Sequence, residues 1–211
     1  MSLEHNNYEK VNVLQVESEV DSFTEDRYRQ FYKNFPVNVD NVLDIGCNTG
    51  RGGTILKELC PKLKLVGIDV VQERLNRLPA SVYSGTFYGS STAIPCESDY
   101  FDVVVAGEFI EHLYPEDVNK TLLEVFRVLK YGGRLLLTTP NPHDLKRKMR
   151  GKSILGGSHV SQHYPKSLKE QLVKIGFCKV SIRGSGKVSR FLGAWFPLWI
   201  YGSYLAIADK N

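Results

Sequence analysis

The sequence predicts an α/β fold with a doubly wound parallel sheet, and three observations lead to this prediction. Short apolar runs typical of buried parallel strands alternate with segments of helical spacing. The first apolar run, Val42–Asp44, leads into the glycine-rich turn Gly46–Gly53 and then into a helix. The next run, Leu63–Asp69, ends in an acid about twenty residues after that turn, where a ribose-binding carboxylate is expected. This strand–turn–helix unit is typical of the front of a nucleotide-binding fold.

Helices are expected where apolar side chains repeat on one face or where proline and glycine mark an end. Thr24–Lys33 carries Tyr28, Phe31 and Tyr32 on one face, and Pro36 ends it. A cap at Tyr131–Gly133 is expected to close the helix that precedes it. In chain order after Thr24–Lys33, the other helices are expected at Thr54–Leu59, Val71–Leu78, Val118–Lys130 and Pro165–Ile175.

Strands are expected wherever a short apolar run lies between turn residues. Ser90–Cys96 and Asn141–Gly157 are expected to be loops. In chain order after Val42–Asp44, the strands are Leu63–Asp69, Val82–Tyr88, Phe101–Ala106, Arg134–Thr139, Phe177–Arg183 and Ser203–Asp209.

The composition is that of a globular protein of 211 residues, with 42% hydrophobic and 24% charged residues. We expect one domain spanning residues 1–211. A net charge of +4 is too small to indicate nucleic-acid binding, and we expect no DNA partner. The four cysteines are scattered without a CxxC pair, so they predict neither a disulfide framework nor a zinc site. Isolated cysteines and the lack of a leader favour a cytoplasmic location.

An ordered set of motifs covers about residues 40–180. It resembles the class I S-adenosylmethionine-dependent methyltransferases, of the small-molecule group that includes the ubiquinone-biosynthesis O-methyltransferases. The resemblance implies a Rossmann-like sheet of seven strands with the last strand antiparallel, and S-adenosylmethionine as cofactor. The motifs are Val42–Gly50, Gly67–Asp69, Ala93–Pro95, Phe101–Val105, Glu108–Leu113, Val128–Leu135, and a Leu-x-x-x-Gly-Phe run ending at Phe177.

The resemblance also suggests which residues contact the cofactor. Asp69 suits the ribose hydroxyls, although an acid at a strand end is by default a surface acid. Asp44 is open between two roles, contact with the cofactor ammonium and a buried cap for the turn. Ser90 replaces the usual aspartate at the adenine, and Asn48 replaces a glycine of the turn. The predicted cofactor residues are Asp44, Gly46, Cys47, Asn48, Gly50, Asp69, Val70, Ser90, Ser91, Gly107 and Glu108.

Methyl transfer depends mostly on positioning in a dry cavity, so a general base is optional. His112, expected to begin the helix after the fourth strand, is the candidate base, against the alternative of a structural histidine. His143, His159 and His163 follow the fifth strand, and their spacing matches no familiar metal pattern. We therefore predict no metal site.

Two segments are expected to shape the pocket. Residues 1–36 form either a helical lid over a ligand or a helix packed on the sheet. Residues 141–164 are a substrate-side insertion, and their basic run Lys146–Lys152 is either a solvated face or a site that attracts an acidic acceptor. The apolar run Phe191–Ala208 is expected to be buried core or a crossover, with weak membrane-surface contact as an alternative and a membrane span least favoured.

The predicted function is transfer of a methyl group from S-adenosylmethionine to a small molecule or a glycan or lipid precursor, with oxygen favoured. Two alternatives remain. One is a non-catalytic module that binds S-adenosylmethionine. The other is an NAD-dependent oxidoreductase, which is disfavoured because the turn lacks regular G-x-G-x-x-G spacing.

Overall fold

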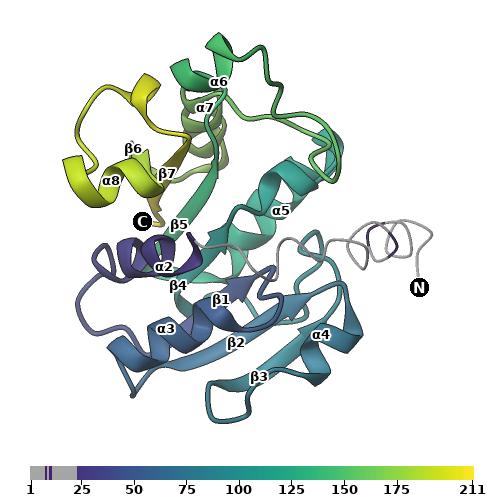
Figure 1. Cartoon of the computed structure of the whole chain (residues 1–211). Helices are drawn as coiled ribbons and strands as arrows, with labels where there is room; N and C mark the ends of the chain where they lie inside the picture. The colour runs from purple at the N-terminus through teal and green to yellow at the C-terminus, as the bar shows by residue number, and fades with distance from the viewer. Residues whose placement is uncertain (1–7, 9, 11–22) are drawn as a thin grey trace.

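One seven-stranded sheet forms the centre of the protein, in the order β3-β2-β1-β4-β5-β7-β6. The computed structural model describes residues 8, 10 and 23–211 (Figure 1). Strand β7 runs antiparallel to both β5 and β6, whereas the pairs among β1 to β5 are parallel. The prediction of a doubly wound, seven-stranded sheet with an antiparallel last strand is confirmed.

Strands and helices alternate along the described chain as the sequence predicts. The strands are β1 (Asn41–Ile45), β2 (Lys64–Asp69), β3 (Tyr83–Tyr88), β4 (Phe101–Gly107), β5 (Leu129–Pro140), β6 (Cys178–Ser185) and β7 (Ser203–Asp209). The helices are α2 (Thr24–Tyr32), α3 (Arg51–Leu59), α4 (Gln72–Asn76), α5 (Pro115–Val128), α6 (Leu145–Met149), α7 (Pro165–Ile175) and α8 (Lys187–Leu192), with 3-10 turns η2 (Ile110–His112) and η3 (Leu198–Ile200).

Each face of the sheet carries its own hydrophobic core because neighbouring strand residues point to opposite faces. Val42 belongs to the core beneath α2 and α3, which lie side by side in Figure 1. Leu43, the next residue, belongs to the core beneath α5 and α7. With both faces covered, the polar ends of the parallel strands are left to form a site at the sheet edge.

The expected boundary between α5 and β5 is wrong. The helix begins three residues early, at Pro115, and ends at Val128, and Tyr131–Gly133 lies inside β5 instead of capping the helix. Gly132 has φ +79°, and its N–H donates to the carbonyl of Lys210 at 2.7 Å. The pairing register between β4 and β5 shifts at this point. The glycines therefore let the strand bend while it stays paired with the C-terminal segment.

Two expectations for the second half of the chain are also corrected. Asn141–Gly157 is not a continuous loop, because Asp144 caps the short helix α6 by accepting from the N–H of Lys146 at 3.2 Å. The run Phe191–Ala208 is buried only from Tyr201 into β7, since Phe191 and Trp195 are exposed. Among the described residues, no helix is both long and apolar enough to cross a membrane.

Candidate functional site

A cavity of about 1250 Å³ opens where the carboxyl ends of β1, β2 and β4 meet. Pockets for one small molecule are typically about 300–1000 Å³, so this cavity has room for a cofactor and a second molecule. Helix α2 and residues of the 141–164 segment complete its wall. The cavity lies at the sheet edge where open α/β folds bind ligands.

The turn after β1 holds its shape through left-handed residues. Gly46, Asn48 and Gly50 have φ of +68°, +50° and +79°. A Cβ on Gly46 would lie 2.7 Å from the Phe109 ring, so glycine is required there for steric as well as backbone reasons. Asn48 takes the left-handed conformation that asparagine tolerates, as the sequence interpretation supposed.

Asp69 is the last residue of β2, and its carboxylate holds the turn after β1 in place. Its Oδ2 accepts from the N–H of Asn48 at 3.0 Å, and its Oδ1 accepts from the N–H of Val71 at 2.9 Å. Burial raises the pKa of the Asp69 carboxyl, while these N–H groups and the charge of Arg74 oppose the rise. A carboxylate in this position faces the cavity with lone pairs for further donors.

Asp44 lies one layer deeper and does not line the cavity. Its two carboxyl oxygens accept from the hydroxyls of Tyr28 and Tyr83, each at 2.6 Å. Burial raises the pKa of Asp44 to about 6, and the two phenol hydrogen bonds limit the rise. The carboxyl is thus a buried acceptor for two phenols, and no N–H group of the turn is seen to donate to it among the described residues. This geometry disfavours contact of Asp44 with the cofactor ammonium, and it shows no cap on the turn.

Two glycines of α3 make room for these phenols. A Cβ on Gly52 would lie 2.0 Å from the Tyr28 ring, and a Cβ on Gly53 would lie 2.2 Å from the Tyr83 hydroxyl oxygen. The first turn of α3 therefore has to be bare for both rings to reach Asp44.

We expect Gly52→Ala to lower the free energy of unfolding by about 1–3 kcal/mol, the usual cost of overpacking a closely packed site. Urea denaturation measures the effect. Gly85→Ala in β3 is the matched control, because its added Cβ would meet only a Val66 methyl at 3.9 Å. Equal stability of the two variants would show that the Tyr28 ring is not held against α3.

The remaining predicted cofactor residues line the cavity, except Gly50. Ser90 bonds Thr92 through their hydroxyls at 2.8 Å, and the hydroxyl of buried Ser91 bonds that of Thr121 in α5 at 2.8 Å. Ser91 therefore ties the loop to α5, whereas Ser90 stays partly exposed. The lining members are Gly46, Cys47, Asn48, Asp69, Val70, Ser90, Ser91, Gly107 and Glu108.

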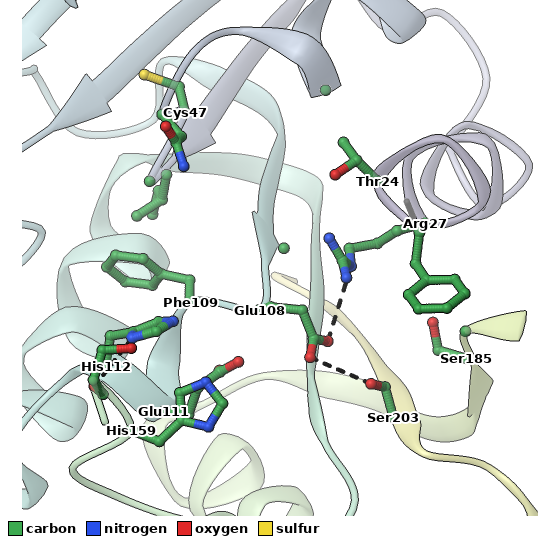
Figure 2. Close-up of a pocket in the computed structure, with 18 of the residues that line it drawn as sticks. Thr24, Arg27, Cys47, Glu108, Phe109, Glu111, His112, His159, Ser185 and Ser203 are labelled. Carbon is green, nitrogen blue, oxygen red and sulfur yellow. Dashed lines mark hydrogen bonds and ion pairs between the residues drawn. The ribbon is translucent and has the colours of Figure 1, made fainter. Parts of the chain in front are cut away.

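Glu108 directly follows β4 and has a left-handed conformation, with φ +51°. Its N–H donates to the carbonyl of Thr138 at 3.0 Å, and its carboxylate accepts from the Ser203 hydroxyl at 3.3 Å. The Arg27 guanidinium lies 3.9 Å from the same carboxylate (Figure 2). A negative side chain is thus held at the cavity wall between α2 and β7.

Glu111, His112 and His159 form a second group, apart from Arg27 and Ser203 in Figure 2. One potential ligand atom from each of the three lies within 4.8 Å of the others. His112 ends the turn η2 and does not begin helix α5, which corrects the expected placement. Burial and the nearby His159 lower the pKa of His112 to about 4. Its imidazole is therefore neutral at pH 7.

Several cavity residues were not singled out from the sequence. Glu111 lies within the Glu108–Leu113 motif, but one acid in a motif gives no indication of burial. Arg27 and Ser203 come from elements far apart in the chain, and no sequence pattern connects them with Glu108. Of the segment 1–36, α2 contributes Thr24, Arg27 and Tyr28 to the cavity, and Tyr8 and Phe23 also line it. The rest of the expected lid, residues 1–7, 9 and 11–22, lies outside the described residues.

Comparison with known proteins finds one matching family and several relatives. Residues 43–137 match the family described as a methyltransferase domain. The demethylmenaquinone methyltransferase of Symbiobacterium thermophilum is 31% identical over 106 residues, covering 46% of this chain and 41% of that protein. The malonyl-[acyl-carrier protein] O-methyltransferase 1 of Coxiella burnetii is 29% identical over 123 residues, covering 58% of this chain and 41% of that protein.

The fold resemblance extends over more of the chain. A solved S-adenosylmethionine-dependent methyltransferase from Archaeoglobus fulgidus superposes with a TM-score of 0.69 at 22% identity, covering 88% of this chain and 92% of that one. The chain matches 30% to 41% of the length of the first four curated relatives. The substrates of those relatives can therefore be assigned to this chain only as a proposal.

Proposed function

Because this chain is a class I S-adenosylmethionine-dependent methyltransferase by its domain and its fold, we propose that it transfers a methyl group to a small-molecule or lipid- or glycan-precursor acceptor at oxygen. One observation carries the proposal: the cavity beside Asp69 exceeds the usual volume of a pocket for one small molecule and continues to the 141–164 segment. We assign the end beside Asp69 to the cofactor and the other end to the acceptor.

The residues at the sheet edge suit the cofactor, which supplies a methyl group on a positively charged sulfur. Asp69 has free lone pairs for the two ribose hydroxyls. Most N–H groups of the Gly46–Gly50 turn already donate within the protein, so they stabilise the turn itself. Ser90 lines the same cavity, which supports its assignment to the adenine. Glu108, held by Ser203, gives this region the negative charge that a cationic sulfur favours.

Positioning and exclusion of water account for most of the expected acceleration. His112 lines the cavity, and its role as general base stays a prediction. Its Nδ1 lies 3.1 Å from the carbonyl oxygen of Ser158, which can only accept, so Nδ1 carries the hydrogen. The Nε2 lone pair is then available, although a group with a pKa of about 4 is a weak base at neutral pH.

Basic residues at the other end favour an acidic acceptor. Lys146 and Arg147 of α6 line the cavity together with Lys187 of α8. These side chains come from two segments, α6 within 141–164 and α8 beyond it. Their charges attract a phosphate or carboxylate and stabilise its bound form.

An apolar groove favours a lipid precursor among the acidic acceptors. The groove, of about 440 Å³, is lined by Leu145, Met149 and Trp199. It shares Asp144, Lys146 and Ile200 with the main cavity. An acceptor with an acidic head and an apolar tail would occupy both. Exposed Phe191, Leu192, Trp195 and Phe196 nearby in the sequence support weak contact with a membrane surface. The cytoplasmic location and the lack of a DNA partner stay predictions.

The test is transfer of radioactive methyl from S-adenosylmethionine to a panel of polyprenyl phosphates, phosphatidic acid, nucleotide-sugars and uncharged phenols. We expect turnover with an acidic lipid. The double variant Lys146→Glu and Arg147→Glu should raise its KM at least about tenfold, since two attractive charges become repulsive. The affinity for S-adenosylhomocysteine should stay unchanged.

The other outcomes are equally informative. Lys62→Glu and Lys64→Glu, away from the cavity lining, form the charge-matched control and should leave KM unchanged. Cofactor binding with no turnover on any acceptor would favour the non-catalytic module. Binding of NAD in place of S-adenosylhomocysteine would overturn the proposal.

A further inference from the structure

We propose that Glu111, His112 and His159 form a binding site for one divalent transition-metal ion in the acceptor half of the cavity. All three residues line the cavity, and their potential ligand atoms lie within 4.8 Å of one another. Two ligands of one such ion are separated by roughly 3–4 Å, given metal–ligand bonds of about 2.0–2.2 Å. Small side-chain rotations would therefore bring the three atoms onto one ion.

The histidines are oriented as metal ligands usually are. Nδ1 of His112 lies 3.1 Å from the Ser158 carbonyl oxygen, and Nδ1 of His159 lies 3.2 Å from the Ile154 carbonyl oxygen. A carbonyl only accepts, so each Nδ1 carries the hydrogen and each Nε2 keeps a lone pair. A backbone carbonyl behind the distal nitrogen is the usual way that proteins fix a metal-binding imidazole.

The Glu111 side chain supplies the independent observation. It is fully buried, and its Oε2 accepts from the Thr139 hydroxyl at 3.0 Å. Its Oε1 is also buried and has no hydrogen-bond partner among the described residues. A buried carboxyl oxygen without a donor is costly, and a bound cation would satisfy it. Figure 2 shows this carboxyl beside the two imidazoles.

The segment that carries His159 is fastened to the turn that carries the other two ligands. The N–H groups of Val160 and Ser161 donate to the Glu111 carbonyl at 2.9 and 3.1 Å, and the Ser161 hydroxyl donates to the Ile110 carbonyl at 3.1 Å. These bonds hold His112 and His159 close together, although 47 positions separate them in the chain. The cluster is not an accident of a freely moving loop, because backbone hydrogen bonds fix its spacing.

The donor set indicates the type of ion. Two imidazole nitrogens and one carboxylate favour Mn²⁺, Fe²⁺, Co²⁺ or Zn²⁺ over Mg²⁺ and Ca²⁺, which prefer oxygen ligands. Three protein ligands leave coordination positions open toward the cavity. The earlier expectation of no metal site rested on spacing in the sequence, which does not show that His159 lies beside Glu111.

The use of this ion depends on the proposed function, although the metal binding itself does not. An acceptor hydroxyl on the ion would lose its proton to water more readily. Its oxygen would then form the new C–O bond as the C–S bond breaks, and the sulfur would keep the electron pair as a neutral thioether. The ion would thus orient the acceptor and replace a strong general base.

The test is titration of the metal-free full chain with Mn²⁺ alone, followed by the loss of the electron paramagnetic resonance signal of free Mn²⁺. We expect one ion per chain with micromolar affinity and a rise in the melting temperature. Glu111→Gln and His159→Ala should each weaken binding at least about tenfold, because loss of even an outer partner costs about 10–100-fold. His143→Ala is the matched control, since His143 packs on Tyr164 away from the cluster and should leave binding unchanged.

Glu111→Gln keeps the buried volume, and partly exposed His159 can be replaced without opening the core, so at least one variant remains measurable. Absence of Mn²⁺ binding, or binding that both variants leave intact, would overturn the metal site. If Mn²⁺ binds but has no effect on methyl transfer, only the proposed role of the ion in orienting and activating the acceptor would be overturned. Failure of the methyltransferase assay would not alter the Mn²⁺ titration, so the two proposals are distinguishable.

Discussion

Asp69→Ala is expected to weaken binding of S-adenosylmethionine and S-adenosylhomocysteine by about 100-fold or more. A carboxylate that accepts from two ribose hydroxyls makes two charge-assisted hydrogen bonds, each worth about 1.5–3 kcal/mol. A 100-fold loss corresponds to about 2.7 kcal/mol. The same variant also releases the N–H groups of Asn48 and Val71, which the carboxylate holds in the native turn. Isothermal titration calorimetry with S-adenosylhomocysteine measures the loss.

A second variant separates ligand contact from support of the turn. Asp69→Asn keeps one oxygen acceptor and the side-chain volume but loses the charge, so its affinity should fall between those of the wild type and Asp69→Ala. Asp40→Ala, at an exposed acid on the opposite edge of the sheet, is the control and should bind normally. Wild-type affinity in Asp69→Ala would remove Asp69 from the cofactor site.

The meeting of the glycine turn and Asp69 at the sheet edge could be predicted because the sequence information for it is local. A buried strand, a glycine turn and a second strand ending in Asp69 occupy less than thirty consecutive residues. Parallel strands bring their carboxyl ends to one edge, so the order of the elements already implies that the turn and Asp69 meet. The structure places Gly46, Asn48 and Asp69 together in the cavity lining.

The surroundings of Asp44 could not be predicted in the same way. Tyr28 precedes the sheet and Tyr83 begins its third strand, so 55 positions separate the two hydroxyls that meet on one carboxyl. Aromatic residues at these positions fit ordinary core packing equally well. Both rings reach Asp44 because Gly52 and Gly53 have no side chains in the way. In the sequence, these glycines were already accounted for by the backbone conformation of the turn, so they did not indicate this packing.

The acceptor end was also inaccessible from sequence patterns. His159 reaches Glu111 and His112 because backbone N–H groups of Val160 and Ser161 dock on η2, and such bonds leave no trace in side-chain periodicity. The exposed rings of Phe191 and Trp195 show the same limit, because apolar composition alone predicted burial. Hydrophobicity indicates which residues favour burial, but the fold determines how many find a covering surface.

Asp44→Asn is expected to remove a large pH-dependent part of the stability. Burial raises the pKa of Asp44 to about 6 in the folded protein, whereas an aspartate in the unfolded chain has a pKa of about 3.9. Between pH 4 and 6 the folded state therefore binds more protons than the unfolded state. The free energy of unfolding falls as the pH rises through this window, and the contribution of Asp44 is fully present only below about pH 4.

The size of the effect follows from the difference between the two pKa values. About two pKa units correspond to about 3 kcal/mol, lost from the wild type between pH 4 and pH 6 and absent from Asp44→Asn. Urea denaturation at intervals from pH 4 to 7.5 measures it as the difference between the two proteins, which cancels the titration of distant groups. Asp40→Asn is the control, because the exposed Asp40 should give a curve parallel to that of the wild type.

The hydroxyls of Tyr28 and Tyr83 determine the pH range over which Asp44 changes the stability. Tyr83→Phe deletes one of the two hydrogen bonds that favour the ionised carboxyl, so the pKa of Asp44 should rise further and the loss of stability should extend to higher pH. A pH dependence that is identical in wild type, Asp44→Asn and Tyr83→Phe would show that Asp44 is not buried between two phenols. A shift in Tyr83→Phe that disappears in the double variant with Asp44→Asn would instead assign the titration to this carboxyl, because double-mutant cycles isolate the coupling between neighbouring side chains.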